Sequence, residues 1–135
     1  MIIDKVLVIA SAVIKNKQGK VLLLQRSKKS SYPGYWQLVE GKLEANESPS
    51  GSLKREIKEE IGVNETRIEM KNIFYSEIEA KGLKYLCIRV VYDTKISSYE
   101  IKTSDEHVSF GWFDMSEIVK LILLPGTEKV IEKVL

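Results

Sequence analysis

The segment from Gly41 to Val63, GKLEANESPSGSLKREIKEEIGV, constrains the fold more strongly than any other part of the chain. Its residues mark both ends of one helix. Ser48 is a favourable N-cap, Pro49 suits the first helical position, and Gly62 can adopt the left-handed conformation that ends a helix. We therefore predict a helix of about three turns from Ser50 to Ile61.

Three glutamates, Glu56, Glu59 and Glu60, share one face of this predicted helix, because successive residues advance by roughly 100°. On an exposed helix such carboxylates repel one another at a cost of about 0.2 to 0.5 kcal/mol per pair. A hard divalent cation such as Mg²⁺ would remove that repulsion, and it commonly completes its coordination with water and substrate phosphate. The alternative is a solvated surface helix of mixed charge, since Glu and Lys are good helix formers.

The glycines and the arginine around these glutamates separate the two interpretations. The whole segment resembles the Nudix box, G-x5-E-x7-R-E-U-x-E-E-x-G-U, in which U is an aliphatic residue. Such a match favours the metal-binding interpretation over the surface helix. Every fixed position of the box is matched in this chain, by Gly41, Glu47, Arg55, Glu56, Ile57, Glu59, Glu60, Gly62 and Val63.

The resemblance implies which atoms of the box bind metal. Glu59 and Glu60 would be ligands, and Glu56 would be either a ligand or the base that activates water. Gly41 ends an apolar, strand-like segment and begins a loop, where a bare backbone can approach a metal closely. Its carbonyl oxygen would be a further ligand.

Arg55 and Glu47 would support the site without binding the metal. Glu47 lies just before the helix N-terminus, where the helix dipole favours a carboxylate, and it would hold the loop through Arg55. Arg55 would take part in catalysis by orienting Glu47 or Glu56, without contacting the substrate.

The activity that the resemblance implies is hydrolysis of a nucleoside diphosphate derivative by metal-activated water, with Mg²⁺ as cofactor and Mn²⁺ as its substitute. The chain looks most like the MutT-type nucleoside triphosphate pyrophosphohydrolases. Hydrolysis of dinucleoside polyphosphates or ADP-sugars, or a non-catalytic module that binds a nucleotide or RNA, are the alternatives. ADP-ribose cleavage loses weight, because relatives with that activity carry a proline beyond the box, and here none occurs between Pro49 and Pro125.

Residues outside the box are predicted to contact the substrate. Arg26 ends the apolar run VLLLQR, where its guanidinium could meet phosphates, although a solvated loop is the alternative. Trp36, which follows Tyr32 and Tyr35 in YPGYW, could form a pocket wall or simply pack. Glu40 stands where many relatives have glycine, and it could lie near the metals.

The segment SDEH, before the last predicted strand, supplies one more acidic residue for the site. Similar Nudix enzymes place a glutamate in this loop as a metal ligand or general base. Glu106 is predicted to have this role, with Asp105 as the alternative. His107 is assigned to the loop or to the pocket wall.

Composition bounds what else the chain can be. With 135 residues, 44% of them hydrophobic, the chain is expected to form a single domain over residues 1–135. The formal charge of +2, from 21 basic and 19 acidic residues, gives no general electrostatic case for nucleic-acid binding. The single cysteine, Cys87, excludes an internal disulfide, and its apolar surroundings indicate burial.

Targeting signals are not evident in the sequence. It contains neither a run of about twenty apolar residues nor a signal-peptide pattern, so we expect a cytoplasmic protein that binds no membrane. The partner that the resemblance implies is a small-molecule nucleotide. A homodimer is compatible with the sequence but is not specified by it.

Apolar runs bounded by turn signals predict the β-strands. A turn at Ala80–Gly82 predicts a long hairpin, and helices are predicted after an Asp114–Glu117 capping box and from Glu128 to Leu135. Helices on both sides of such strands predict an α/β fold, a Nudix-type α/β/α sandwich with a central mixed β-sheet. The strands are expected at Val6–Ile14, Val21–Gln25, Trp36–Val39, Ile68–Glu77, Lys84–Thr94 and Val108–Phe113.

Overall fold

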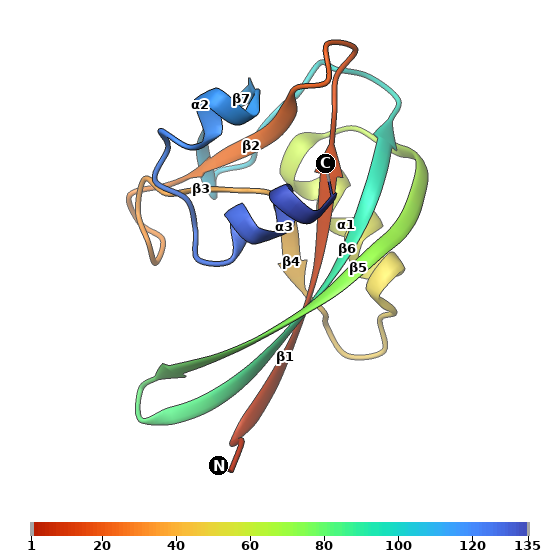
Figure 1. Cartoon of the computed structure of the whole chain (residues 1–135). Helices are drawn as coiled ribbons and strands as arrows, with labels where there is room; N and C mark the ends of the chain where they lie inside the picture. The colour runs from red at the N-terminus through yellow and green to blue at the C-terminus, as the bar shows by residue number, and fades with distance from the viewer. Residues whose placement is uncertain (1, 135) are drawn as a thin grey trace.

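The computed structural model describes residues 2–134, so Leu135, at the end of the last predicted helix, lies outside the described residues. Figure 1 shows a mixed α/β chain. Its elements in chain order are β1 (Lys5–Ile14), β2 (Val21–Arg26), β3 (Trp36–Gln37), β4 (Val39–Lys42), α1 (Pro49–Ile61), β5 (Glu65–Ala80), β6 (Leu83–Ile96), β7 (His107–Phe113), α2 (Met115–Ile118) and α3 (Thr127–Val134).

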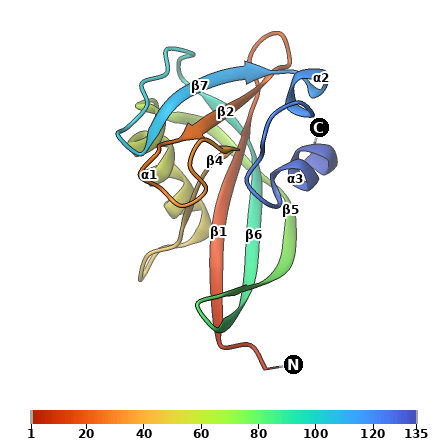
Figure 2. The same ribbon diagram turned by 90° about the vertical axis from the view of Figure 1, so that its left-hand side faces the viewer.

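The strands form two sheets. The larger has the order β4-β1-β6-β5 and is mixed, because β1 runs parallel to β6 while its other pairs are antiparallel. The smaller is antiparallel, with the order β3-β2-β7. Helices α1 and α3 lie on opposite sides of β1 and β6 (Figure 2). The predicted α/β/α sandwich with a central mixed sheet is therefore confirmed.

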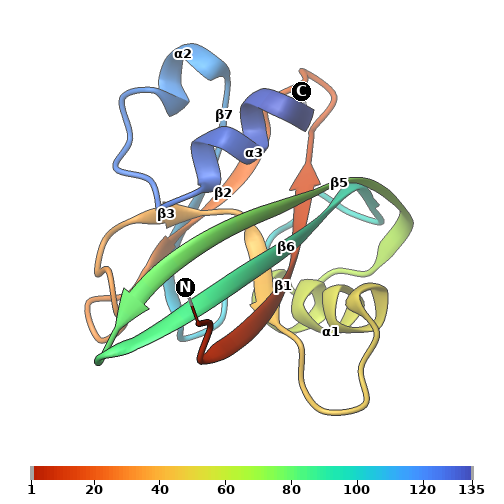
Figure 3. The same cartoon turned by 60° about the horizontal axis from the view of Figure 1, so that its bottom comes forward.

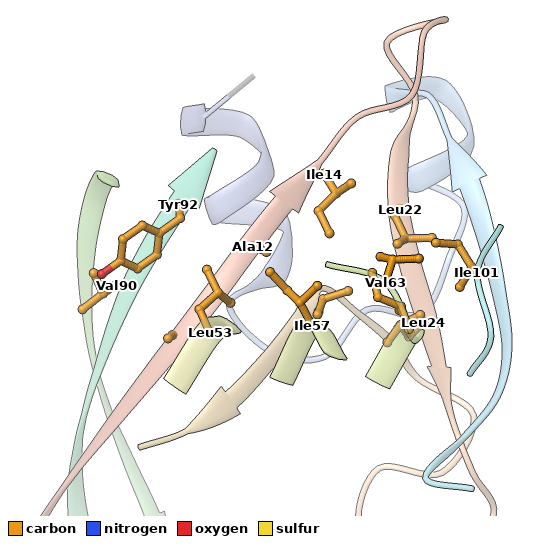
Figure 4. Packing of buried hydrophobic residues seen from close by; sticks show 13 residues of the cluster. Ala12, Ile14, Leu22, Leu24, Leu53, Ile57, Val63, Val90, Tyr92 and Ile101 are labelled. Carbon is orange, nitrogen blue, oxygen red and sulfur yellow. The ribbon is translucent and has the colours of Figure 1, made fainter. Parts of the chain in front are cut away.

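Buried side chains on alternate sides of the strands form two hydrophobic cores. Along β1, Ala10, Ala12 and Ile14 face the core that contains α1, whereas Val13 belongs to the core that contains α3. Because both faces of β1 are buried in its second half, this part of the strand is almost entirely apolar, with Ser11 as the exception. Figure 4 shows the first core, in which the apolar face of α1 meets both sheets through Leu53, Ile57, Ala12, Ile14, Leu22, Leu24, Val63, Val90, Tyr92 and Ile101.

Both ends of α1 agree with the sequence signals. The side-chain oxygen of Ser48 accepts a hydrogen bond of 3.0 Å from the backbone N–H of Gly51, and Pro49 occupies the first turn. Gly62 has φ = 70°, and its N–H bonds to the carbonyl of Lys58. The predicted helix from Ser50 to Ile61 is confirmed with one more residue at its start.

The predicted hairpin turn at Ala80–Gly82 is also present. Lys81 and Gly82 both have positive φ, 53° and 76°, as in the type I′ turns that suit two-residue hairpins. The strands that it joins are longer than predicted, Glu65–Ala80 and Leu83–Ile96. The hairpin extends away from the helices together with the N-terminal half of β1 (Figures 1 and 3).

Two local predictions are wrong. The expected strand Trp36–Val39 is divided between the sheets: β3 pairs with β2, β4 pairs with β1, and Leu38 joins them. Gly41, expected at the start of a loop, lies inside β4 opposite Ala10. A continuous apolar run contains no signal for a change of sheet, because both sheets bury the same kinds of side chain.

The segment after β7 keeps its predicted start but not its predicted length. Asp114 and Glu117 form the capping box, each side chain accepting a hydrogen bond from the backbone N–H of the other. The helix nevertheless ends at Ile118, whereas the apolar pattern of IVKLI, residues 118–122, predicted that it would continue. None of the helices in residues 2–134 has the length and apolar character that crossing a membrane requires.

An ion pair attaches the loop before α1 to the helix. The Nε and Nη2 atoms of Arg55 donate to the two carboxylate oxygens of Glu47 at 2.8 and 3.0 Å, and Glu47 also accepts from the backbone N–H of Glu44. These contacts lower the pKa of Glu47 from 4.5 to about 2. Bidentate pairing of this kind fixes orientation as well as contact.

Packing of α1 predicts that Ile57→Ala destabilises the protein by about 2 to 5 kcal/mol, because the side chain is fully buried in the first core and its removal leaves a cavity. Urea unfolding measures the change. Lys54→Ala, on the exposed side of the same helix, is the control and should change the stability by no more than about 0.5 kcal/mol. Equal losses in the two variants would contradict the packing described.

The Glu47–Arg55 pair predicts a pH-dependent difference in stability. A carboxyl with a lowered pKa stabilises the fold above its ordinary pKa of 4.5, and the effect disappears as the pH falls toward about 2. Wild type should therefore have a higher unfolding midpoint than Glu47→Gln near neutral pH, and the difference should shrink through this interval. Glu44→Gln, at a more exposed carboxylate 3.6 Å from Arg55, should show a smaller difference.

Candidate functional site

The site begins with a close contact between α1 and β4. A Cβ atom placed on Gly41 would overlap the carboxyl group of Glu56, so a larger residue there would displace that side chain from its present position. One turn further along α1, Oε1 of Glu60 accepts a hydrogen bond of 3.1 Å from the backbone N–H of Glu40. The absence of a side chain at Gly41 thus allows two carboxylates of α1 to lie directly against β4.

The three glutamates of the predicted acidic face differ greatly in exposure. The side chains of Glu60, Glu56 and Glu59 are 4%, 14% and 58% exposed, respectively. Burial raises the pKa of Glu60 well above its ordinary value, and the nearby carboxylate of Glu56 adds to the effect. Burial also raises the pKa of Glu56, while the positive charge of Arg55 opposes that rise. The acidic face is therefore graded from core to solvent rather than uniformly solvated.

Arg55 links the loop to the glutamates of α1. Its Nη1 atom donates to Oε1 of Glu56 at 2.8 Å and to Oε2 of Glu59 at 3.2 Å, while its other donors hold Glu47. The carboxylate of Glu47 raises the pKa of Arg55 still further, so the guanidinium is permanently charged. Arg55 thus contacts both residues that it was expected to orient.

The start of β7 brings a second acidic residue to the buried glutamates. The backbone N–H of Ser27 donates to the carbonyl of Glu106 at 3.1 Å, which attaches this loop to the end of β2. Carboxylate oxygens of Glu60 and Glu106 and a ring nitrogen of His107 all lie within 4.8 Å of one another. The loop before β7 thus brings Glu106 next to Glu60. Asp105 lies in the same loop and lines a cavity together with these two residues.

His107 is closer to the acidic cluster than the sequence suggested. Its Nε2 lies 3.5 Å from Oε2 of Glu60, and its buried Nδ1 has no hydrogen-bond partner among residues 2–134. Burial and the positive charge of Arg26 lower its pKa to about 4, so the imidazole is neutral at neutral pH. A neutral imidazole can coordinate a metal ion. The only signal in the sequence was that this single histidine directly follows Glu106.

A cavity of about 500 Å³ joins the acidic cluster to a basic loop. Glu60 and Glu106 line one part of it, and Arg26 and Lys29 line another. The guanidinium of Arg26 donates to the carbonyl and hydroxyl of Ser31 at 2.7 and 3.1 Å, and to Oε1 of Gln37 at 2.5 Å. These contacts fix its orientation at the cavity wall. The full lining is Arg26, Ser27, Lys29, Ser30, Ser31, Gln37, Glu40, Glu60, Asp105, Glu106 and His107.

The aromatic residues near Arg26 do not line this cavity. The ring of Trp36 packs edge-on against Phe113 with centroids 5.1 Å apart, and it belongs to the second hydrophobic core. Tyr32 and Tyr35 pack against each other at 5.3 Å. The structure thus places Trp36 in the packing position that was the alternative to substrate contact.

Two polar residues that organise the site were not predicted from the sequence. Gln37 is buried and holds Arg26, and Arg89 forms an ion pair of 3.0 Å with the carboxylate of Glu40. Both interrupt apolar runs, WQLV and YLCIRVVY. A polar side chain within a strand buried on both faces needs a partner, and that signal was available in the sequence.

The donors of this cluster suit a hard divalent cation. Burial raises the pKa of Glu60, and the charges of three nearby carboxylates, those of Glu56, Glu40 and Glu106, raise it further. Oε1 of Glu40 is buried and has no hydrogen-bond partner in residues 2–134. Oxygen donors with excess negative charge are the ligands that Mg²⁺ and Mn²⁺ prefer.

Sequence comparison gives an independent result. The family model of the NUDIX domain matches residues 5–134. The chain is 39% identical to the CTP pyrophosphohydrolase of Escherichia coli K12 over 128 residues, which cover 95% of this chain and 90% of that protein. It is 45% identical to the 8-oxo-dGTP diphosphatase of Proteus vulgaris over 67 residues, which are 50% of this chain and only 60% of that enzyme's length.

Structural comparison agrees. A MutT Nudix hydrolase from Burkholderia pseudomallei superposes with a TM-score of 0.79 at 26% identity, covering 96% of this chain and 98% of that one. The matched region thus includes both sheets, α1 and the residues of the acidic cluster. The chain belongs to the Nudix family.

Proposed function

We propose that the protein hydrolyses nucleoside triphosphates to a nucleoside monophosphate and pyrophosphate, with Mg²⁺ as the cofactor. Water adds across the anhydride between the α- and β-phosphates, so one P–O bond forms and one breaks. The names of the CTP pyrophosphohydrolase and the 8-oxo-dGTP diphosphatase among the relatives support this class of substrate.

One observation carries the proposal: a buried carboxylate, an exposed carboxylate and a fixed arginine line the same cavity. Glu60 and Glu106 lie near each other, and the guanidinium of Arg26 lines another part of the cavity. A polyphosphate bound to a divalent cation has the complementary charges, since the cation meets the carboxylates and phosphate oxygens meet the arginine. Substrate and cofactor would thus be bound together.

The residues proposed to hold the cation are Glu56, Glu59, Glu60 and Glu106, together with the carbonyl of Gly41. When bound, a divalent cation lowers the pKa of coordinated water and neutralises charge that develops on the phosphates. Glu60 is fixed for this role by the backbone N–H of Glu40. Glu59 is the most exposed of the three carboxylates on α1, so it can turn toward a ligand without crossing the core.

Arg26 is proposed to orient the phosphates. Its contacts with Ser31 and Gln37 use three of the five N–H groups that a guanidinium has, which leaves two for phosphate oxygens. Because those contacts fix the side chain before substrate binds, little rotamer freedom is lost on binding. Lys29, exposed on the same loop, adds positive charge at the cavity.

Proton transfer from the attacking water is assigned to Glu56 or Glu106. Glu56 is partly buried, and Arg55 holds its carboxylate at 2.8 Å, so its orientation is fixed. Glu106 directly precedes β7, lines the cavity and is more exposed than Glu56. Gln substitutions at the two positions test the two assignments. The expected cytoplasmic location and homodimer remain predictions.

The proposed cleavage site predicts the products. Incubation with Mg²⁺ and a mixed pool of nucleoside triphosphates should yield nucleoside monophosphates and pyrophosphate, identified by mass spectrometry. Addition of EDTA in excess should abolish turnover, because no carboxylate of the cluster can replace the cation as an electrophile. Release of nucleoside diphosphate and inorganic phosphate would assign a different scissile bond. No turnover of the whole pool would contradict the proposal.

The assigned role of Glu60 predicts that Glu60→Gln lowers kcat by about a hundredfold or more, as loss of a principal electrostatic group does. Steady-state kinetics with the preferred triphosphate measures the change. Glutamine keeps an oxygen that can accept the N–H of Glu40, so the thermal midpoint in EDTA should not fall. Glu128→Gln, at an exposed position on α3, is the matched control and should retain activity. Equal activity of the two variants would exclude Glu60 from the mechanism.

A further inference from the structure

A buried ion pair between Glu40 and Arg89 is not used by the proposed hydrolysis. Nη2 of Arg89 lies 3.0 Å from Oε2 of Glu40, and the two side chains are only 13% and 6% exposed. The residues lie on β6 and β4, the strands on either side of β1, opposite Ile9 and Ser11. The pair therefore spans β1, and removing two charges from water in this way has a considerable cost.

The pair leaves donors and an acceptor unused. The buried Nε of Arg89 and the buried Oε1 of Glu40 have no hydrogen-bond partner within residues 2–134, and Arg89 donates only to Glu40. A Cβ atom on Gly126 would lie 2.5 Å from Nη1 of Arg89 and would displace this end of the guanidinium, and the φ of 91° at Gly126 also favours glycine. Buried polar groups without partners are uncommon in folded proteins, so each of them needs an explanation.

Arg89 lines a second cavity, of about 330 Å³, whose walls are largely apolar. Three aromatic residues, Tyr32, Phe74 and Tyr75, contribute to the lining, and Leu124 adds an aliphatic contact. Glu40 lines the first cavity, so the ion pair connects the two. The loop that carries Ser30 and Ser31 at the first cavity carries Tyr32 at the second. The two cavities therefore adjoin at this ion pair and at this loop.

The chemistry of the second cavity differs from that of the first. Glu40 balances the charge of Arg89, and Lys129 adds one positive charge to a lining that is otherwise largely apolar. Aromatic walls suit a planar heterocycle, and a guanidinium can only donate hydrogen bonds. Its partner must therefore present acceptors. Guanine offers two adjacent acceptors, O6 and N7, and cytosine offers O2 and N3. Adenine has an N6–H donor beside N7, and uracil has an N3–H donor beside O2.

We propose that Arg89, held in place by Glu40, is a specificity-determining residue that donates hydrogen bonds to the acceptor edge of a guanine or cytosine base in the second cavity. The inference rests on the proposed function in one respect, that the phosphates of the same nucleotide occupy the first cavity. Adenine and uracil nucleotides are disfavoured, because each would place a donor against the guanidinium and leave its own N–H without a partner.

Binding of nucleoside monophosphates in EDTA tests the inference without turnover. Isothermal titration calorimetry with GMP, CMP, AMP and UMP should give at least one of the first two about tenfold tighter binding than both of the others, as expected for a good bidentate contact. The double substitution Glu40→Gln with Arg89→Met removes both charges, so neither is left buried alone, and it should reduce this preference to less than about twofold. Arg67→Gln, at an exposed position on β5, should leave the preference unchanged.

A second variant covers the case in which the double variant does not fold. Arg89→Lys keeps the charge opposite Glu40 but lacks the planar fork, so it should retain the fold and lose most of the preference. Unfolding midpoints of all variants are measured alongside binding. Equal binding of the four monophosphates by wild type, or an unchanged preference in Arg89→Lys or the double variant, would overturn the inference.

Turnover of the four triphosphates with Mg²⁺ separates this inference from the proposed function. The ratio of kcat/KM between the preferred nucleotide and ATP should fall about tenfold in Arg89→Lys, mainly through KM, because the contact is made before the chemical step. Arg89-dependent binding of GMP or CMP without any hydrolysis would support the inference and exclude the proposed function. Hydrolysis with a base preference that does not depend on Arg89 would support the proposed function and overturn the inference.

Discussion

The close approach of α1 to β4 is the contact on which the rest of the site depends. Gly41 has no side chain, so the carboxylate of Glu56 fills the space where a Cβ would lie, and the next turn brings Glu60 to the backbone N–H of Glu40. Any larger residue would displace the helix or its carboxylates. The apolar side of the same helix packs into the first core through Leu53 and Ile57, which fixes its distance from the sheet.

Local signals predicted the parts of the fold that local interactions determine. Ser48 and Gly62 mark the ends of α1 because their side chain or backbone satisfies groups that the helix leaves unpaired, and Lys81 and Gly82 adopt the turn expected of them. The division of the Trp36–Val39 strand depends on pairing with distant strands, which short apolar runs do not encode. Among the site residues the same limit applied, since the burial of His107 follows from tertiary packing.

Charge in the site is arranged so that a cation is favoured before any substrate binds. Burial and mutual repulsion raise the pKa of Glu60, while Arg55 neutralises mainly the outer carboxylates, Glu47, Glu56 and Glu59. The innermost negative charge is therefore left for a metal ion. Arg26 lines the same cavity and forms no ion pair with a carboxylate of residues 2–134, and Ser31 and Gln37 hold it through neutral oxygens. Preorganised charges of this kind need little rearrangement during a reaction.

The change of sheet at Leu38 also sets the dimensions of the site. Gln37, on β3, holds Arg26, and the backbone of Glu40, on β4, holds Glu60. These two anchors are three residues apart in one extended stretch of chain, so their separation cannot exceed about 11 Å. This connection thus limits the distance between the two backbone positions that hold the arginine and the innermost carboxylate. The backbone between these two anchors therefore limits how far the two sheets can separate at this point.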